Sequence, residues 1–535
     1  MGTAKEVIEQ GRASLGIEFG STRIKAVLID EENSPVASGS WQWENRYEDG
    51  IWTYSTDDIW GGLQGCFRQL QSNVKEKYDT QITKLKALGI SGMMHGYLVF
   101  DKEGKLLVPF RTWRNTITGQ AADILTRELN FNIPERWSIA HLYQAVLNDE
   151  PHVKNIAFMT TLAGYVHWKL TGEKVVGIGE ASGIFPVDSV TKNYRSGFLE
   201  KCSRLFEKNN YMWKLEDILP RVLAAGENAG TLSSEGALLI DPEGNLLAGV
   251  PLCPPEGDAG TGMTATNSIE SHTGNVSAGT SIFAMAVLKE DLKKVHTEID
   301  MVTTPDGNPV AMVHCNNCTS DLNAWISLFK EFAGLAGAEI SENELYEKLF
   351  KKALEGRSDC GGILSFNYYA GEPVAGFEKG SPVIARDVRV PFTLADFMRT
   401  QITTILATLK LGMDILQKEE GVKLDKLYGH GGLFKTKAVM QKIMAAAFDT
   451  PVEVMETAGE GGAWGIALLA SYMAELNDNK NRCSLQEFLQ EKVFNDCKSS
   501  IMKPDREDTE GFEKYMERFV KGFSVERAAA DVLSF

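Results

Sequence analysis

Pro254-Pro255-Glu256-Gly257-Asp258-Ala259-Gly260-Thr261-Gly262 carries the carboxylate of Asp258 inside a run of glycine and small residues. A second glycine turn with two hydroxyls follows at Val276-Ser277-Ala278-Gly279-Thr280-Ser281, and residues 282–288 behind it are apolar. Glycine lets backbone N–H groups approach a bound group closely, and consecutive N–H groups in such turns form a concavity that suits an anion. The two turns therefore offer one proton acceptor and one phosphate cradle, a combination that indicates phosphoryl transfer to a hydroxyl.

The overall composition is that of a large globular protein. The chain has 535 residues, which exceeds the size of a domain with a single hydrophobic core. We therefore expect two large domains. The net charge of −17 disfavours a nucleic-acid partner, because the phosphate backbone would be repelled. Residues 1–14 lack the apolar core of a signal peptide, and no run of about 18 apolar residues predicts a membrane span. The eight cysteines form no disulfide-like framework, and we expect a reducing, cytoplasmic location.

A third glycine turn lies near the N-terminus. Residues 15–19 are typical of a buried strand, Gly20-Ser21-Thr22 of a turn, and residues 24–30 of the returning strand. Glu18 stands just before this turn and Lys25 just after it. Such a hairpin would direct N–H groups and hydroxyls at one point, as a phosphate requires. An ordinary hairpin without a ligand is the alternative interpretation.

Two further segments contain side chains suited to a polyhydroxylated ligand. The predicted strand at 88–90 runs into a loop with Met94 and His95. Downstream, Trp113 stands between two arginines and is followed by Arg114 and Asn115. An aromatic ring can stack on the C–H face of a sugar, and the polar groups can bond its hydroxyls. The alternatives are a structural histidine and a surface arginine cluster at a helix start.

The second half of the chain repeats the order of the first, with a strand and glycine turn followed by more strands and long helices. Residues 427–433 predict a strand that enters the turn Gly431-Gly432 before a helix at 438–448. Backbone exposed there can approach a flat ring or a phosphate closely. We therefore predict one domain at 1–268 and another at 269–535, with a helical extension from about residue 477. Cys315 and Cys318 could be half of a zinc site, but structural or incidental cysteines are the favoured interpretation.

Taken together, the turns resemble those of the FGGY family of carbohydrate kinases, in the actin, hexokinase and Hsp70 superfamily. The resemblance runs from about residue 15 to residue 474. Its motifs are Glu18-Phe19-Gly20-Ser21-Thr22-Arg23-Ile24-Lys25, Glu256-Gly257-Asp258-Ala259-Gly260-Thr261-Gly262, Val276-Ser277-Ala278-Gly279-Thr280-Ser281 and Gly429-His430-Gly431-Gly432. Within the family, Ile90-Ser91-Gly92-Met93-Met94-His95-Gly96 is most similar to the corresponding loop of xylulokinases.

The resemblance implies an α/β fold with two actin-like (ribonuclease H-like) domains around a deep interdomain cleft. Sugar would bind mainly to the N-terminal domain and ATP mainly to the C-terminal one, and domain closure would exclude water. Asp258 would be the general base that takes the proton from the attacking sugar hydroxyl. Glu18 would help to hold Mg²⁺, directly or through water. The other implied contacts are Met94, His95, Trp113 and Arg114 for the sugar, Gly20, Ser21, Thr22 and Lys25 for the transferred phosphoryl group, Gly279 and Thr280 for the nucleotide phosphates, and Gly431 and Gly432 for the adenosine.

The chain departs from the family pattern in three segments. Glu18 stands where the family usually has aspartate, and one extra methylene moves the carboxylate by roughly 1.5 Å. Trp113-Arg114-Asn115 stands where xylulokinases usually show Trp-Asn-Asp, so a cation replaces an acceptor. Ala259 removes a side chain that often contacts the sugar beside the base. These changes leave the identity of the sugar open.

The sequence thus predicts an ATP- and Mg²⁺-dependent kinase for a terminal hydroxyl of a small keto sugar, with a ketopentose of the xylulose or ribulose type favoured. A deoxyketohexose, a polyol or a sugar acid is an alternative acceptor. A catalytically weak sugar or nucleotide sensor and a chaperone-like ATPase are alternatives of other classes. We expect small-molecule partners and neither nucleic acid nor membrane. A homodimer is compatible with these expectations.

Overall fold

The computed structural model describes residues 3–206, 211–457, 459–478 and 483–533. The chain forms two compact units. Unit 1 comprises Met1–Ile269, Asp300–Val310 and Glu460–Asp496, and unit 2 comprises Glu270–Ile299, Ala311–Gly459 and Cys497–Phe535. Two segments that lie after residue 268, Asp300–Val310 and Glu460–Asp496, thus belong to unit 1. The predicted division into 1–268 and 269–535 does not include this return of the chain. The assignment of sugar and nucleotide to separate domains stays a prediction.

Unit 1 is built on a mixed sheet of five strands in the order β13-β6-β1-β2-β3. Its strands are β1 (Ser14–Phe19), β2 (Arg23–Ile29), β3 (Pro35–Gln42), β6 (Ala87–Gly92) and β13 (Glu256–Gly257). β1 and β2 pair antiparallel, which confirms the predicted hairpin, whereas β1 and β13 each run parallel to β6. The carboxyl ends of these three parallel strands therefore meet at one edge of the sheet.

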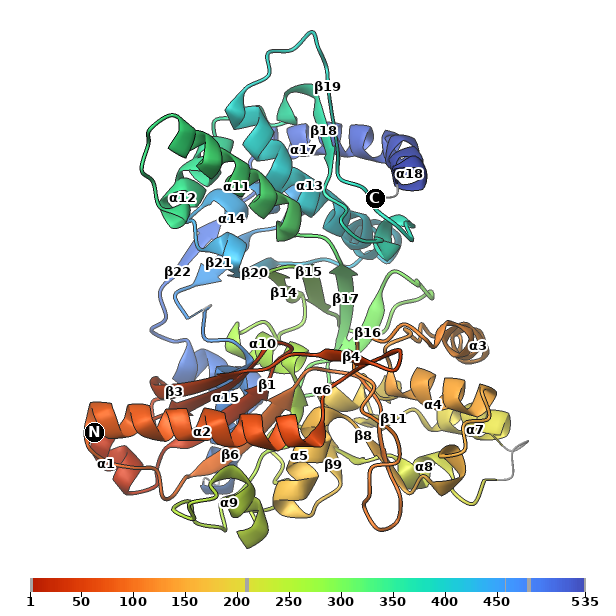
Figure 1. The fold of residues 1–535 in the computed structure, drawn as a ribbon, viewed down its shortest axis with the longest axis vertical. Helices are drawn as coiled ribbons and strands as arrows, with labels where there is room; N and C mark the ends of the chain where they lie inside the picture. Colours follow the sequence, from red (N-terminus) through yellow and green to blue (C-terminus); the bar gives the residue numbers. More distant parts are fainter. Residues whose placement is uncertain (1–2, 207–210, 458, 479–482, 534–535) are drawn as a thin grey trace. The chain divides into compact units, whose positions relative to one another are not determined.

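Helices α2 (Thr56–Tyr78) and α15 (Gly462–Asp478) cover opposite faces of this sheet, as Figure 1 shows with α2 in front and α15 behind. Two glycines allow the close approach. A Cβ atom on Gly16 would lie 2.1 Å from a backbone oxygen of α15, and one on Gly39 would lie 2.4 Å from a backbone oxygen of α2. Successive residues of a strand point to opposite faces, and the strand register places these two glycines on different faces. The sheet is therefore packed on both sides.

Shorter elements complete unit 1. The helices are α1 (Ala4–Glu9), α3 (Gly119–Leu129), α4 (Ser138–Leu147), α5 (Leu162–Thr171), α6 (Ile178–Ala181), α7 (Ser196–Phe206), α8 (Leu215–Ile218), α9 (Ser234–Ile240), α10 (Asp258–Ala265) and α16 (Leu485–Phe488). The short strands are β4 (Arg46–Glu48), β5 (Ile51–Thr53), β7 (Leu98–Phe100), β8 (Phe158–Thr160), β9 (Val175–Gly177), β10 (Val187–Asp188), β11 (Asn193–Tyr194) and β12 (Arg221–Leu223). No helix in the described part of the chain has the length and apolar character needed to cross a membrane.

The second large sheet has seven strands in the order β16-β17-β15-β14-β20-β21-β22. They are β14 (Thr273–Ala278), β15 (Ile282–Val287), β16 (Asp300–Thr303), β17 (Pro309–Cys315), β20 (Lys426–Gly431), β21 (Val452–Met455) and β22 (Ser499–Met502). A separate pair is formed by β18 (Ile363–Phe366) and β19 (Val383–Arg386). The predicted glycine turn at Gly279-Thr280 is present, and the structure adds that it closes a hairpin, because β14 and β15 pair antiparallel on either side of it.

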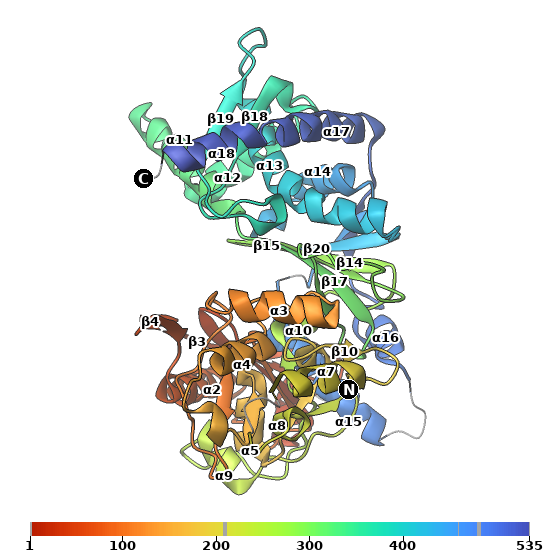
Figure 2. The same cartoon turned by 90° about the vertical axis from the view of Figure 1, so that its right-hand side faces the viewer.

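The helices of unit 2 gather on one side of this sheet (Figures 1 and 2). They are α11 (Thr319–Leu335), α12 (Glu342–Ala353), α13 (Leu394–Asp414), α14 (Val439–Phe448), α17 (Arg506–Lys521) and α18 (Phe523–Val532). The predicted C-terminal extension therefore contains helices and also strand β22, which pairs with β21. Residues 479–482 and 534–535 of that extension lie outside the described residues.

Candidate active site

Three predicted site segments follow neighbouring parallel strands of unit 1. In the register of β1, β6 and β13, Phe19 and Gly257 both lie opposite Gly92. The Gly20–Thr22 turn, the Met94–His95 loop and Asp258 therefore emerge at the same edge of the sheet. The carboxyl ends of parallel strands are where ligands commonly bind in α/β proteins. The sheet register thus brings together residues that are far apart in the sequence.

Asp258 is the first residue of α10, so its carboxylate lies at a helix N-terminus. The backbone N–H of Met94 donates a hydrogen bond to its Oδ1 at 3.3 Å. Partial burial raises the pKa of Asp258 to about 6, although hydrogen bonds from backbone N–H groups act in the opposite direction. A carboxylate with this pKa is ionised at pH 7 and is a stronger proton acceptor than an ordinary aspartate. The environment therefore suits a general base.

Glu18 provides a second carboxylate near Asp258. Its Oε2 accepts a hydrogen bond from the N–H of Ala463 at 3.1 Å, and it lies opposite Lys25 in the pairing of β1 with β2. Burial and the negative charge of Asp258 raise the pKa of Glu18 to about 7, and the Lys25 ammonium acts in the opposite direction. Lys25 also donates to the backbone oxygen of Glu460 at 2.6 Å. Two carboxylates and one cation are thus placed around the first glycine turn.

Aromatic side chains hold this glycine turn in place. Trp43 Nε1 donates to the backbone oxygen of Gly20 at 2.7 Å, and the hydroxyl of Tyr54 donates to that of Ser21 at 2.5 Å. The Trp43 and Tyr54 rings stack with their centroids 4.1 Å apart. Thr22 is exposed. Neither aromatic residue could be assigned to this turn from the sequence, because nothing local to Trp43 or Tyr54 points to it.

The Met94–His95 loop has an unusual backbone. His95 has φ of 68° and Gly96 has φ of 91°, both in the left-handed region. The Nδ1 atom of His95 hydrogen-bonds to the backbone oxygen of Gly183 at 3.2 Å, and its ring stacks on Trp137 with centroids 6.1 Å apart. Because a carbonyl oxygen can only accept, Nδ1 carries the proton, and in the neutral ring Nε2 is then an acceptor. The loop therefore holds the imidazole in one tautomer and one orientation.

Trp113 and Arg114 are less closely connected to this edge. The exposed guanidinium of Arg114 lies over the Trp52 ring, 4.4 Å from its centroid, and 6.0 Å from the centroid of Trp113. In the described part of the chain, no hydrogen bond or ion pair joins either side chain to Asp258. Their predicted contact with the sugar stays a prediction.

Sequence reasoning missed two buried carboxyl groups behind Asp258. Glu256 accepts hydrogen bonds from the N–H groups of Gly179 at 3.2 Å and Glu180 at 2.8 Å, which fastens α6 to β13. Burial raises the pKa of Glu256 to about 8. The Glu180 carboxyl is fully buried, and its pKa is raised well above the usual value by burial and by the nearby Glu256 and Asp258. The available sequence signal for Glu256 was its position two residues before Asp258. Nothing in the sequence marked Glu180.

The other two predicted turns meet at one edge of the seven-stranded sheet. Parallel pairing of β14 with β20 places Ala278 opposite Gly431, so the Gly279-Thr280 turn and the Gly431-Gly432 turn are neighbours. A Cβ atom on Gly431, which has φ of 98°, would lie 2.4 Å from the backbone oxygen of Ala278. All four turn residues are exposed. The sheet thus presents two adjacent stretches of accessible backbone, as nucleotide binding requires.

Comparison with known proteins places this geometry in a family. The sequence profile of "FGGY family of carbohydrate kinases, N-terminal domain" matches residues 13–258, and that of the C-terminal domain matches residues 274–474. The chain belongs to the FGGY family of carbohydrate kinases. It is therefore a carbohydrate kinase with the two-domain, actin-like fold of that family, and ATP is its implied cosubstrate. The interdomain cleft and the individual site roles stay predictions.

Individual relatives are similar to this FGGY kinase at low identity. The xylulose kinase of Haemophilus influenzae is 21% identical over 530 residues, which cover 95% of this chain and 99% of that protein. A ligand-bound xylulose kinase structure from Lactobacillus acidophilus has a TM-score of 0.78 at 15% identity, covering 98% of this chain and all of that one (100%). A gluconate kinase structure from Lactobacillus acidophilus has a TM-score of 0.75 at 16% identity, covering 97% and 98%. These structures support the fold.

The donor groups of this FGGY kinase fit Mg²⁺ bound together with a nucleotide. Mg²⁺ prefers oxygen ligands, keeps several waters and is usually held by one or two carboxylates plus substrate phosphates. Glu18 and Asp258 supply two such carboxylates, close enough for their charges to interact. Residues 3–533, apart from the gaps given above, contain no group of three or more His, Cys, Asp or Glu side chains arranged to hold a metal.

Cys315 and Cys318, which the sequence offered as half of a zinc site, are buried free thiols.

Proposed function

We propose that this FGGY kinase transfers the γ-phosphoryl group of ATP to a terminal hydroxyl of a small keto sugar, a ketopentose of the xylulose or ribulose type. One observation carries the proposal. The Asp258 carboxylate accepts a hydrogen bond from the first residue of the Met94–His95 loop, and this loop is most similar to that of xylulokinases. The proposed base and the proposed sugar-recognition loop are therefore parts of one local structure.

In this mechanism the sugar binds to unit 1 and the nucleotide to unit 2. Asp258 accepts the proton of the attacking hydroxyl, and His95 and Met94 orient the sugar. Thr22, Lys25 and the backbone of Gly20 and Ser21 face the transferred group. Phosphoryl transfer depends mainly on positioning and charge stabilisation, so one weak base is sufficient.

Unit 2 would bind the nucleotide through its two turns. Gly279 and Thr280 would hold the phosphates, and Gly431 and Gly432 would lie against the adenosine. Glu18, together with Asp258, would hold Mg²⁺, which neutralises phosphate charge when bound. The expected homodimer and cytoplasmic location stay predictions.

A sugar acid is the second candidate acceptor, because one observation favours it. Arg114 is exposed and held over Trp52, so its guanidinium is preorganised for an anionic group. Planar guanidinium groups bind carboxylates through two parallel hydrogen bonds. An Arg114→Asn variant separates the two candidates. It should lower kcat/KM for a sugar acid by roughly tenfold or more, as loss of a charged hydrogen bond implies, and should leave a neutral ketopentose almost unaffected.

The proposal is tested by coupled measurement of ADP release over a panel of ketopentoses, deoxyketohexoses, polyols and sugar acids. We expect sugar-dependent turnover, and Asp258→Asn should reduce kcat by about 10² to 10⁴, the usual contribution of a general base. Asp241→Asn is a matched control, because Asp241 is a buried carboxylate that orders its own turn by accepting hydrogen bonds from the N–H groups of Glu243, Asn245 and Leu246. Comparable turnover in the Asp258 variant would refute the assignment. Sugar-independent ATP turnover would favour a chaperone-like ATPase, and binding without turnover would favour a sensor.

A further inference from the structure

The Gly279-Thr280 turn is fastened from one side by the start of α11. The N–H of Cys318 donates to the backbone oxygen of Thr280 at 3.1 Å. The hydroxyl of Thr319 donates to the backbone oxygen of Gly279 at 2.9 Å. Two successive carbonyl groups of the turn are therefore held by two successive residues of the Cys315–Thr319 segment.

This attachment determines where the N–H groups of the turn point. The C=O and N–H of one trans peptide unit point in opposite directions. With the carbonyls of Gly279 and Thr280 directed at α11, the N–H groups of Thr280 and Ser281 are directed away from it. Among the described residues, no acceptor for either N–H is found. The turn thus presents two successive free donors on its exposed side, the arrangement that binds an anion.

The Cys315–Thr319 segment is itself supported by a buried carboxylate. Glu372 accepts hydrogen bonds from the N–H of Asn316 at 3.2 Å, the N–H of Asn317 at 3.2 Å and the side-chain amide of Asn317 at 3.0 Å. The side-chain oxygen of Asn317 accepts from the N–H groups of Tyr369 at 2.8 Å and Ala370 at 3.0 Å. A buried carboxylate that accepts three hydrogen bonds holds its donors more rigidly than water could.

We propose that Thr319 and Glu372 are positioning residues for nucleotide binding. Glu372 fixes the Cys315–Thr319 segment, and Thr319 together with the Cys318 amide fixes the Gly279-Thr280 turn with its N–H donors exposed. Neither side chain needs to touch the nucleotide. The inference rests on the proposed function in one respect, namely that nucleotide phosphates bind at this turn.

The first test removes one hydrogen bond with little change in volume. Thr319→Val deletes the donor to Gly279, and Thr319→Ser keeps it. Titration of the full-length protein with ATP and Mg²⁺ should show that Thr319→Val raises the Kd for ATP about tenfold. This is less than the roughly 10²-fold loss of rate that a misplacement of about 1 Å can cause. Thr319→Ser should bind ATP as the wild-type protein does. In turnover assays the KM for ATP should rise while the KM for the sugar stays unchanged.

The second test compares two buried glutamates of unit 2. Glu372→Gln replaces a carboxylate that supports the turn. Glu526→Gln is the matched control, because Glu526 is also buried and accepts a backbone hydrogen bond, from Ser381 at 2.8 Å, but among the described residues it makes no hydrogen bond to the Cys315–Thr319 segment. Glu372→Gln should raise the Kd for ATP by about tenfold, a change expected from loss of a charged hydrogen bond. Glu526→Gln should leave the Kd unchanged at a comparable melting temperature.

The outcomes separate this inference from the proposed function. If the wild-type protein binds ATP but Thr319→Val and Glu372→Gln bind it equally well, the positioning role is wrong and the proposed function stands. If the KM values for ATP and sugar rise together, the residues act on general stability, and the inference is also wrong. If the wild-type protein fails to bind ATP, both the proposed nucleotide site and this inference are overturned.

Discussion

Asp258 shows how burial prepares a residue for chemistry at a cost in stability. Its pKa is raised from 3.8 to about 6, so the folded chain binds this proton more tightly than the unfolded chain. Stability contributed by the group is therefore present below about pH 4 and is lost as pH rises through about 6. At neutral pH the ionised carboxylate destabilises the fold, which is the usual direction for a buried acid.

The first residue-scale prediction concerns stability. Asp258→Asn should raise the free energy of unfolding at pH 7.5 by about 1 kcal/mol, a value discounted because the carboxylate is partly exposed. The gain should shrink as pH falls through about 6 and vanish below about pH 3, where the carboxyl is protonated in both states. Melting temperatures of the variant and wild type across this pH range provide the measurement. A destabilised variant at pH 7.5 would contradict the burial argument.

The second residue-scale prediction concerns the pH dependence of turnover. The proposed base, Asp258, must be ionised to accept a proton, so kcat should fall as pH decreases through about 6. Glu18, with a pKa raised to about 7, interacts with Asp258, so the apparent values belong to the pair. Glu18→Gln removes a negative charge and should move the acid limb to lower pH. The measurement is kcat from pH 5 to 9 at saturating Mg²⁺ and substrates for the wild type and Glu18→Gln. An acid limb at the same pH in both proteins would exclude the interaction between Glu18 and Asp258.

Helix α15 determines the site at the scale of elements. It packs on β1 and on α10, the helix that begins with Asp258. A Cβ atom on Gly465 would lie 2.0 Å from the backbone oxygen of Thr261 in α10, and one on Gly462 would lie 2.4 Å from Glu18 Oε1. Because backbone atoms cannot move aside as a flexible side chain can, Gly465 sets the distance between α15 and α10.

The element-scale prediction follows from this contact. Gly465→Ala should destabilise the protein by about 1–3 kcal/mol, the range for overpacking, and should lower kcat because α10 carries Asp258. Gly61→Ala is the control, since a Cβ atom at Gly61 of α2 meets nothing within 4 Å. That variant should be stabilised by up to about 1 kcal/mol through helix propensity. Denaturant unfolding and steady-state kinetics test both, and a stable, fully active Gly465→Ala enzyme would contradict the packing argument.

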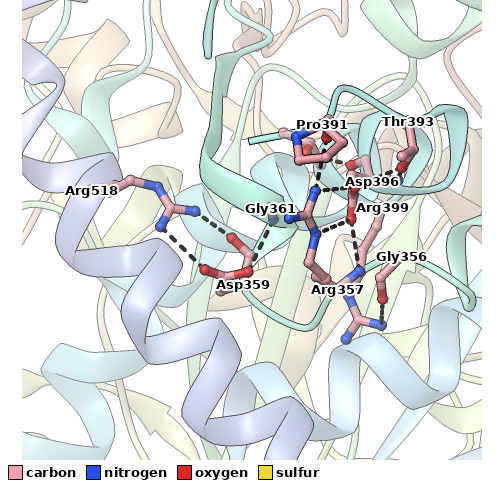
Figure 3. A network of polar contacts seen from close by, with 10 residues as sticks. Gly356, Arg357, Asp359, Gly361, Pro391, Thr393, Asp396, Arg399 and Arg518 are labelled. Carbon is pink, nitrogen blue, oxygen red and sulfur yellow. Dashed lines mark hydrogen bonds and ion pairs between the residues drawn. The ribbon is translucent and has the colours of Figure 1, made fainter. Parts of the chain in front are cut away.

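At the scale of the whole molecule, the C-terminal segment is an integral part of unit 2. Arg518 of α17 contacts Asp359, while Arg357 binds Asp396 near the start of α13 with Nη2 and Oδ2 2.6 Å apart, as Figure 3 shows. Arg399 of α13 forms a buried ion pair with Asp508 of α17 at 2.5 Å. The contacts of Arg518 and Asp508 join α17 to residues far away in the sequence, and they fasten this helix to the rest of unit 2.

The corresponding prediction concerns the Arg399–Asp508 ion pair. Asp508→Ala should lower the stability of unit 2 by about 3–5 kcal/mol, because it leaves the Arg399 charge buried without its main partner. Replacing both residues with Met and Leu should cost less than the single change. Chemical denaturation of the three proteins gives the comparison. A double variant that is less stable than Asp508→Ala would show that the ion pair itself, and not the unpaired charge, determines the effect.

Local sequence was sufficient to predict the glycine turns and the hairpin of β1 and β2. Glycines, hydroxyls and apolar periodicity act over a few residues, so their consequences are readable without a structure. The family resemblance then predicted the two-domain, actin-like fold, which the comparisons confirm. The roles of the site residues stay predictions.

Only the tertiary structure decided which distant groups surround each turn. Glu18 accepts its hydrogen bond from Ala463, 445 residues away, because α15 returns to unit 1. Trp43 and Tyr54 support one turn, and Glu372 supports another through Asn317, by contacts that no local pattern encodes. Sheet register and helix packing determine these neighbours, because the exposure of apolar surface to water is minimised over the entire chain and not within any one segment.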